Sequence, residues 1–142
     1  SKAEAFWGGR LDAYFDDFRE LLSSRPVDED VIESVLAVRR IQDSSADPQQ
    51  LAANKLRVRI VADKERIASA DLWAVYERWC DAVAEHVRRR HPSLTGYEAD
   101  AVGHMVWAAV WVAVTAWVHS GEDSAESFYA QVPSAVEAIR NL

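Results

Sequence analysis

The sequence is poor in the residues that interrupt helices. Its 142 residues include only 5 glycines and 4 prolines, and these two are the least favourable residues in a helix interior. Few breakers favour long helices over short strands joined by turns. We therefore expect an all-α fold in one domain, residues 1–142, and 49% hydrophobic residues are enough to give it a core.

Cysteine and positive charge are also scarce. Cys80 is the single cysteine and has no partner for an internal disulfide, which is typical of the reducing cytoplasm. Lysine and arginine total 16 against 23 acidic residues, a net charge of -7. Because most non-specific DNA affinity comes from neutralising phosphates, we expect no DNA binding by this segment alone. No signal peptide is visible, so the expected location of this soluble chain is the cytoplasm.

The sequence lacks the common signatures of catalysis and metal binding. It contains no HExxH, ExxH, GxSxG, Walker or GxGxxG pattern. The histidines at positions 86, 91, 104 and 119 have no cysteine or carboxylate at ligand spacing. Without an activating group nearby, Cys80 is expected to be a packing residue. We expect no enzymatic activity, no metal and no cofactor.

Hydrophobic periodicity, such as the stripe of Phe15 and Phe18, and capping residues predict a bundle of about six helices. The predicted caps include capping boxes at residues 1–4 and 95–98 and the N-cap Asp47. The expected segments are residues 1–25, 28–45, 47–62, 65–90, 95–121 and the apolar stripe ending at 142. Gly8 and Gly9 fall inside the first segment, where we expect a packing reason for them, the alternative being a hinge. Pro133 is expected to kink the last helix or delay its start. Residues 56–61 alternate like a strand, but a lone strand has nothing to pair with, so we expect helix there.

The run from Ala101 to Val118 is apolar enough to raise the question of a membrane span. Its length of about 18 residues reaches the lower limit for crossing a bilayer. The other helices are amphipathic and charged, and a buried central helix is equally apolar. We therefore expect a core helix and no membrane association.

Two different faces can be distinguished on this apolar helix at 100° per residue. One carries the polar or amphipathic side chains of His104, Trp107, Trp111 and Thr115. The opposite face carries Val106, Val110, Ala113 and Trp117 and has no ionisable side chain. This pattern suggests a self-association surface on the dry face and a cavity on the other. The alternative is a plain core helix in which Asp100 satisfies His104.

Aromatic residues strengthen the cavity hypothesis. Six tryptophans occur in this one domain, and Trp73, Tyr76 and Trp79 share one segment. Large aromatics commonly line apolar ligand pockets, although they also fill ordinary cores. Arg57 and Arg59, with Arg39 and Arg40, offer cations for an acidic ligand group, or else form a solvated face.

Several segments resemble the TetR family of transcriptional regulators. Ser1-Lys2-Ala3-Glu4-Ala5-Phe6 is similar to the start of the fourth helix in that family, directly after its helix-turn-helix domain. Further matching features are Arg57…Arg59-Ile60-Val61, the 79–87 segment, a glycine-containing link and the apolar helix ending Ala116-Trp117-Val118…Gly121. Their order resembles regulators of the mycofactocin-associated group, whose sensing domains bind acyl-CoA-like ligands.

The resemblance implies a TetR C-terminal-domain-like sensor, with the DNA-binding helix-turn-helix lying outside this chain. It implies a repressor that forms a homodimer through a four-helix interface and binds a largely apolar effector, acyl-CoA-like in the subgroup. It also implies that Phe6 and Trp7 contact the DNA-binding domain. The expected interface residues are Val106, Val110, Ala113, Trp117, Phe128, Val132 and Val136. The alternative is a stand-alone helical interaction module with a fully packed interior and no small-molecule ligand.

Overall fold

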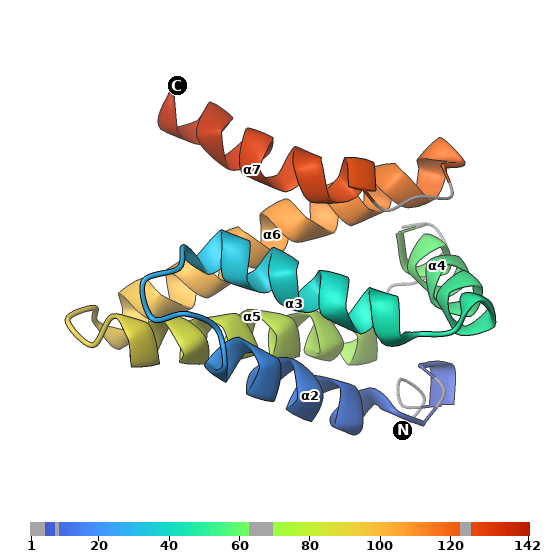
Figure 1. Cartoon of the computed structure of the whole chain (residues 1–142), viewed down its shortest axis with the longest axis horizontal. Helices are drawn as coiled ribbons and strands as arrows, with labels where there is room; N and C mark the ends of the chain where they lie inside the picture. The colour runs from blue at the N-terminus through green and yellow to red at the C-terminus, as the bar shows by residue number, and fades with distance from the viewer. Residues whose placement is uncertain (1–4, 8, 63–69, 123–125) are drawn as a thin grey trace.

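The computed structural model describes residues 5–7, 9–62, 70–122 and 126–142. This part of the chain contains six helices and no strand, which confirms the all-α prediction (Figure 1). The helices are α2 (Leu11–Ser23), α3 (Val31–Ser45), α4 (Pro48–Ala62), α5 (Ala70–Arg90), α6 (Gly96–Ser120) and α7 (Glu126–Arg140).

Helices α5 and α6 form the antiparallel pair on which the others assemble. Helix α7 runs back along α6, α2 packs on α5, and α3 lies between α2 and α7 (Figure 1). Helix α4 crosses one end of the bundle, and its main partner is α6. The other helices pack directly against one another. At this end, by contrast, α4 lies across the bundle and packs mainly on α6.

The helix ends follow the capping residues of the sequence. The Asp30 side chain accepts hydrogen bonds from the first amides of α3, and Asp47 accepts one from the Gln50 amide at 2.7 Å. Thr95 and Glu98 form the predicted capping box of α6. Gly121 ends α6 with a φ of 77°, a conformation that favours glycine. Residues 56–61 are helical, as predicted.

The prediction of one continuous helix from residue 1 to 25 is wrong. Helix α2 begins only at Leu11, and Gly9 before it has a φ of 71°. A Cβ at Gly9 would have no atom within 4 Å, so glycine is used here for its backbone conformation and not for close packing. The capping box predicted at residues 1–4 lies outside the described residues.

The core is built from the apolar stripes that the sequence predicts. Phe15, Phe18 and Leu22 of α2 are fully buried, and each such side chain contributes about 1.5–3 kcal/mol by leaving water. Asp12, on the opposite face of α2, is exposed. Pro133 lies inside α7, which continues past it to Arg140.

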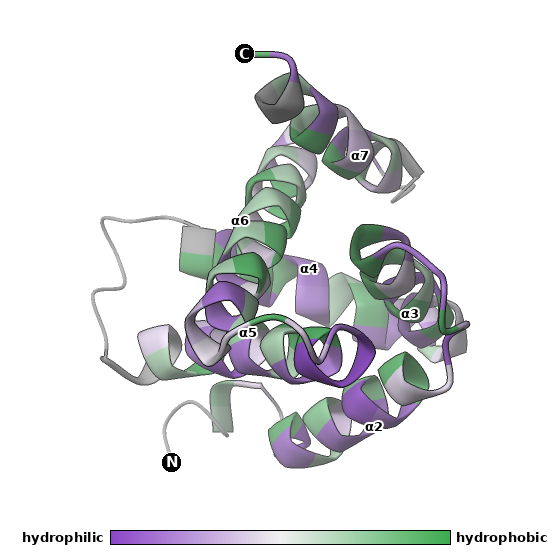
Figure 2. Cartoon of the chain, turned by 90° about the vertical axis from the view of Figure 1, so that its left-hand side faces the viewer, coloured by the Kyte–Doolittle hydropathy of each residue, from purple (hydrophilic) through white to green (hydrophobic). Residues whose placement is uncertain are grey.

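Helix α6 differs from its neighbours in being apolar almost all round (Figure 2). By length and composition it is the one described helix that could cross a membrane, a test that core helices of soluble proteins also pass. Its buried side follows Gly103, Val106, Val110 and Ala113. Met105 and Val112 on its other side remain 63% and 65% exposed.

A candidate ligand cavity

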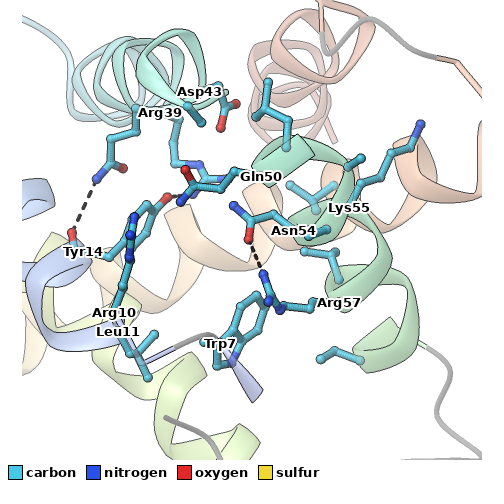
Figure 3. A pocket seen from close by; sticks show the side chains of 18 of the residues that line it. Trp7, Arg10, Leu11, Tyr14, Arg39, Asp43, Gln50, Asn54, Lys55 and Arg57 are labelled. Atoms are coloured by element: carbon cyan, nitrogen blue, oxygen red, sulfur yellow. Dashed lines mark hydrogen bonds between the residues drawn. The ribbon is translucent and has the colours of Figure 1, made fainter. Parts of the chain in front are cut away.

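A cavity of about 1630 Å³ lies between α4 and the rest of the bundle (Figure 3). Side chains from α2, α3, α5 and α6 line it, together with α4 and Phe128 at the start of α7. Its size exceeds the range of about 300–1,000 Å³ typical of small-molecule sites, and it is open to solvent on one side. The interior between these helices is therefore not fully packed.

All six tryptophans of the chain line this cavity. The Trp79 and Trp107 rings stack with centroids 4.4 Å apart and planes 5° from parallel. Trp73 stacks on Tyr76 at 5.3 Å, and Tyr76 meets the edge of Trp111 at 6.3 Å. Helices α5 and α6 thus present a wall made of two groups of packed aromatic rings.

The adjoining wall, from α2 and α3, carries polar side chains. The Arg39 guanidinium donates a hydrogen bond to the Tyr14 hydroxyl. Gln42 donates to an Asp17 carboxylate oxygen at 3.1 Å, and Asp43 accepts a hydrogen bond from the Tyr129 hydroxyl. Burial raises the pKa of Tyr14, so its phenol is neutral at physiological pH. These side chains are thus linked to one another by hydrogen bonds between helices.

Several buried polar atoms on these walls have no hydrogen-bond partner in the structure. They are Nε1 of Trp7 and Trp107, Nε of Arg39 and Oε1 of Gln42, and in the described residues only His86 Nδ1 joins them. An unpaired buried polar atom costs about 1–3 kcal/mol. Four of the five such atoms belong to residues that line the cavity, which is where a water molecule or ligand can pair with them.

Six of the residues predicted to bind a ligand line the cavity, and three do not. The lining residues are Trp73, Tyr76, Trp79, Trp107, Trp111 and Arg57. The His104 ring is exposed and contacts the Asp100 backbone carbonyl at 2.9 Å. Thr115 donates to the Val112 carbonyl, and Arg59 is exposed. The side chains of His104 and Thr115 therefore bond to the backbone of their own helix instead of lining the cavity.

The face of α6 assigned to self-association is already covered within one chain. Val106, Val110 and Ala113 are buried, as are Phe128 and Val132 of α7. Trp117 stacks on Phe128 and both line the cavity, while Val136 is half-buried. Within one chain, α5 and α7 pack against α6, so these predicted interface side chains present little surface to a partner.

The polar wall of the cavity was only partly visible in the sequence. Arg39 was recognised as a cation, but Tyr14, Gln42 and Asp43 were not connected to a site. The sequence contains one signal for this wall: Gln42 lies on the same helical stripe as Val35 and Val38. The structure agrees, because the Gln42 side chain is only 7% exposed. A polar residue at a core position of an amphipathic helix indicates a buried partner or a ligand.

No protein-family model, curated protein or solved structure matches this chain. The functional assignment therefore depends on the geometry of the cavity and on the residues of the sequence.

Proposed function

We propose that this chain is a sensor domain that binds a largely apolar small molecule in the cavity beneath α4. The observation that carries the proposal is the combination of an aromatic wall with unpaired polar atoms around one large opening. Ligand pockets typically combine apolar walls with a few polar groups that set orientation. A stand-alone interaction module needs no such opening, and its interior would be packed to near-crystal density.

The wider context that we propose is a TetR-like repressor. The resemblance of the segments around Ser1–Phe6, Arg57–Val61 and Ala116–Gly121 supports it, as does an all-helical bundle with an internal cavity. DNA would be read by a helix-turn-helix outside these 142 residues, because the net charge of -7 disfavours phosphate contacts. Ligand binding under α4 would then shift α2 and α3, which precede α4 in the chain.

The homodimer is proposed to form through the exposed side of α6, not its dry face. Met105 and Val112 lie there with Ala101, Ala108 and Thr115, spaced alternately by four and three residues. This spacing is the pattern of helix pairing. Between positions 101 and 120, α6 contains no Asp, Glu, Lys or Arg, and its titratable residues there are His104 and His119. A second copy would cover this stripe with its own α6.

Thermal shift across a ligand panel tests the sensor proposal. Fatty acids, acyl-CoAs and aromatic compounds are added to the wild type, and at least one should raise the melting temperature with saturation. Val58→Trp places a large side chain on α4 where it lines the cavity, and should abolish the response. Val27→Trp, at a position 76% exposed and outside the cavity, is the matched control.

If no compound stabilises the wild type, the sensor proposal fails and the interaction module becomes the better account. The same conclusion follows if Val58→Trp responds as strongly as Val27→Trp, because binding would then lie elsewhere.

A further inference from the structure

The cavity walls have more hydrogen-bond donors than acceptors left to satisfy. The unpartnered donors are the Trp7 and Trp107 indole N–H groups and Arg39 Nε–H, against one acceptor, Gln42 Oε1. The three lining carboxylates already accept hydrogen bonds from Gln42, from Tyr129 and from the amide of Gln50. A ligand that completes these walls must chiefly bring acceptors.

The charges of the cavity lining lead to the same conclusion. The chain has a net charge of -7, but its cavity is lined by four cations, Arg10, Arg39, Lys55 and Arg57, and by three carboxylates. Lys55 donates to the Glu122 carbonyl at 2.6 Å, and Arg57 donates to the Asn54 side chain at 2.9 Å. Arg39 forms no ion pair with any described carboxylate, although its Nε is buried.

The position of Arg39 joins the polar wall to the aromatic wall. Its guanidinium carbon lies 5.4 Å from the centre of the Trp79 ring, and Trp79 stacks on Trp107. The Tyr14 ring packs edge-on against Trp79 at 5.3 Å and holds Arg39 through its hydroxyl. An anionic group at Arg39 would therefore place the atoms attached to it beside the indole rings.

We propose that the cavity binds an amphipathic carboxylate, with its carboxylate on Arg39 and its apolar body along the wall of Trp107 and Trp111. This inference rests on the proposed sensor function and specifies the ligand class. The Asp43 carboxylate attracts the Arg39 guanidinium without forming an ion pair with it, and is itself hydrogen-bonded by Tyr129. The buried Arg39 Nε–H therefore has no acceptor, and an ionised acceptor is the group that compensates it best. A thioester such as an acyl-CoA has no free carboxylate at its acyl end, so it would not satisfy Arg39 in this way.

The test compares ligands that differ only in the head group. Decanoate, methyl decanoate and decanol are titrated calorimetrically at pH 8, where the acid is ionised, and 2-naphthoate and its methyl ester form an aromatic arm. The arms distinguish an aliphatic from an aromatic source of the same carboxylate. A carboxylate should bind about 10- to 100-fold more tightly than its ester, the range expected for one hydrogen bond to a charged group.

Three variants assign the preference to Arg39. Arg39→Met should remove the preference for the carboxylate, so that decanoate and methyl decanoate bind with similar affinity. Arg39→Lys keeps the charge but loses Nε–H, and should reduce the preference without abolishing it. Arg59→Met makes the same change of charge at an exposed position outside the cavity, and should bind as the wild type does.

The outcomes separate this inference from the proposal beneath it. If esters and decanol bind as tightly as the carboxylates, the cavity is a ligand site but the carboxylate assignment is wrong. The assignment also fails if Arg39→Met, or Arg39→Lys should the first variant not fold, keeps the full preference. If nothing in either arm binds and the panel by thermal shift is also silent, the sensor function fails as well.

Discussion

His86 shows how one buried side chain makes stability depend on pH. It is 2% exposed, and burial together with the charges of Arg90 and Arg89 lowers its pKa from 6.5 to about 4. Its Nδ1 has no hydrogen-bond partner, so the folded protein offers little to a protonated ring. The neutral imidazole is thus the form that fits the core.

We predict that the free energy of unfolding falls as the pH drops from 6.5 to 4. In this window the unfolded chain binds a proton at His86 that the folded chain does not, so acid favours unfolding, by about 3 kcal/mol at most. Above pH 6.5 the contribution is fully present. Urea unfolding at a series of pH values measures the slope, and His86→Leu should flatten it.

The exposed His119 provides the control: it is not among the charges that act on His86, so His119→Gln should keep the wild-type slope. Glu29 affects the free energy of unfolding in a lower pH range. The hydrogen bond from Arg25 lowers the pKa of the Glu29 carboxyl from 4.5 to about 2. Its stabilisation is therefore lost only as the pH falls below 4.5. A slope between pH 6.5 and 5 that survives His86→Leu would contradict the assignment to His86.

At the scale of elements, the close crossing of α5 and α6 depends on Gly103. A Cβ there would lie 2.5 Å from the Cys80 carbonyl oxygen and 2.9 Å from the Ala84 Cβ. These contacts are with backbone and with a short side chain, so the helices themselves would have to move apart. Since both helices line the cavity, this crossing also sets the position of its aromatic wall.

Gly103→Ala should destabilise the protein by about 1–3 kcal/mol, the usual cost of overpacking a close contact. Gly96→Ala is the matched control on the same helix, because a Cβ there meets no atom within 4 Å. That variant should be neutral or more stable by up to about 1 kcal/mol. Urea denaturation compares them, and equal stabilities for both would show that the crossing tolerates a methyl group.

The sequence predicted elements well where local signals agree with packing. The capping box at Thr95, the N-cap Asp47 before α4, and the stripe of Phe15 and Phe18 have their predicted roles. The second helix was expected from Asp28, whereas Asp30 caps it and α3 begins at Val31. The break at Gly9 was missed because the apolar spacing continues from Trp7 to Leu11 across it. Periodicity reports which side chains face the core but not whether the backbone between them stays helical.

The faces of α6 were harder to predict for a related reason. A helix that is apolar all round has no polar side to fix its rotation. His104 and Thr115 were expected to face a cavity, but short polar side chains on a helix can bond to their own backbone, as both do here. The aromatic half of the cavity was predictable because tryptophans recur on α5 and α6, whereas the polar half needed the placement of α2 and α3.

At the scale of the whole molecule, the exposed stripe on α6 predicts a dimer. Val112→Asp introduces a charge at a position 65% exposed in the single chain, so the monomer should still fold. It should dissociate the dimer in light scattering at micromolar concentration, because an unpaired charge would be buried in the interface. Val27→Asp, on an exposed loop, should remain dimeric. A monomeric wild type would remove the dimer from the proposal.

The central claim is that a largely apolar small molecule binds inside this chain, and tryptophan emission tests it most directly. Because all six indoles line the cavity, a ligand there must alter their surroundings. Titration with decanoate and with 2-naphthoate should change the emission with saturation and protect the indoles from acrylamide quenching. Trp111→Ala should weaken binding by a few kcal/mol, about the cost of removing a large buried aromatic contact. An emission spectrum and a quenching rate unchanged by either compound, and by acyl-CoAs and other aromatic compounds, would contradict the claim.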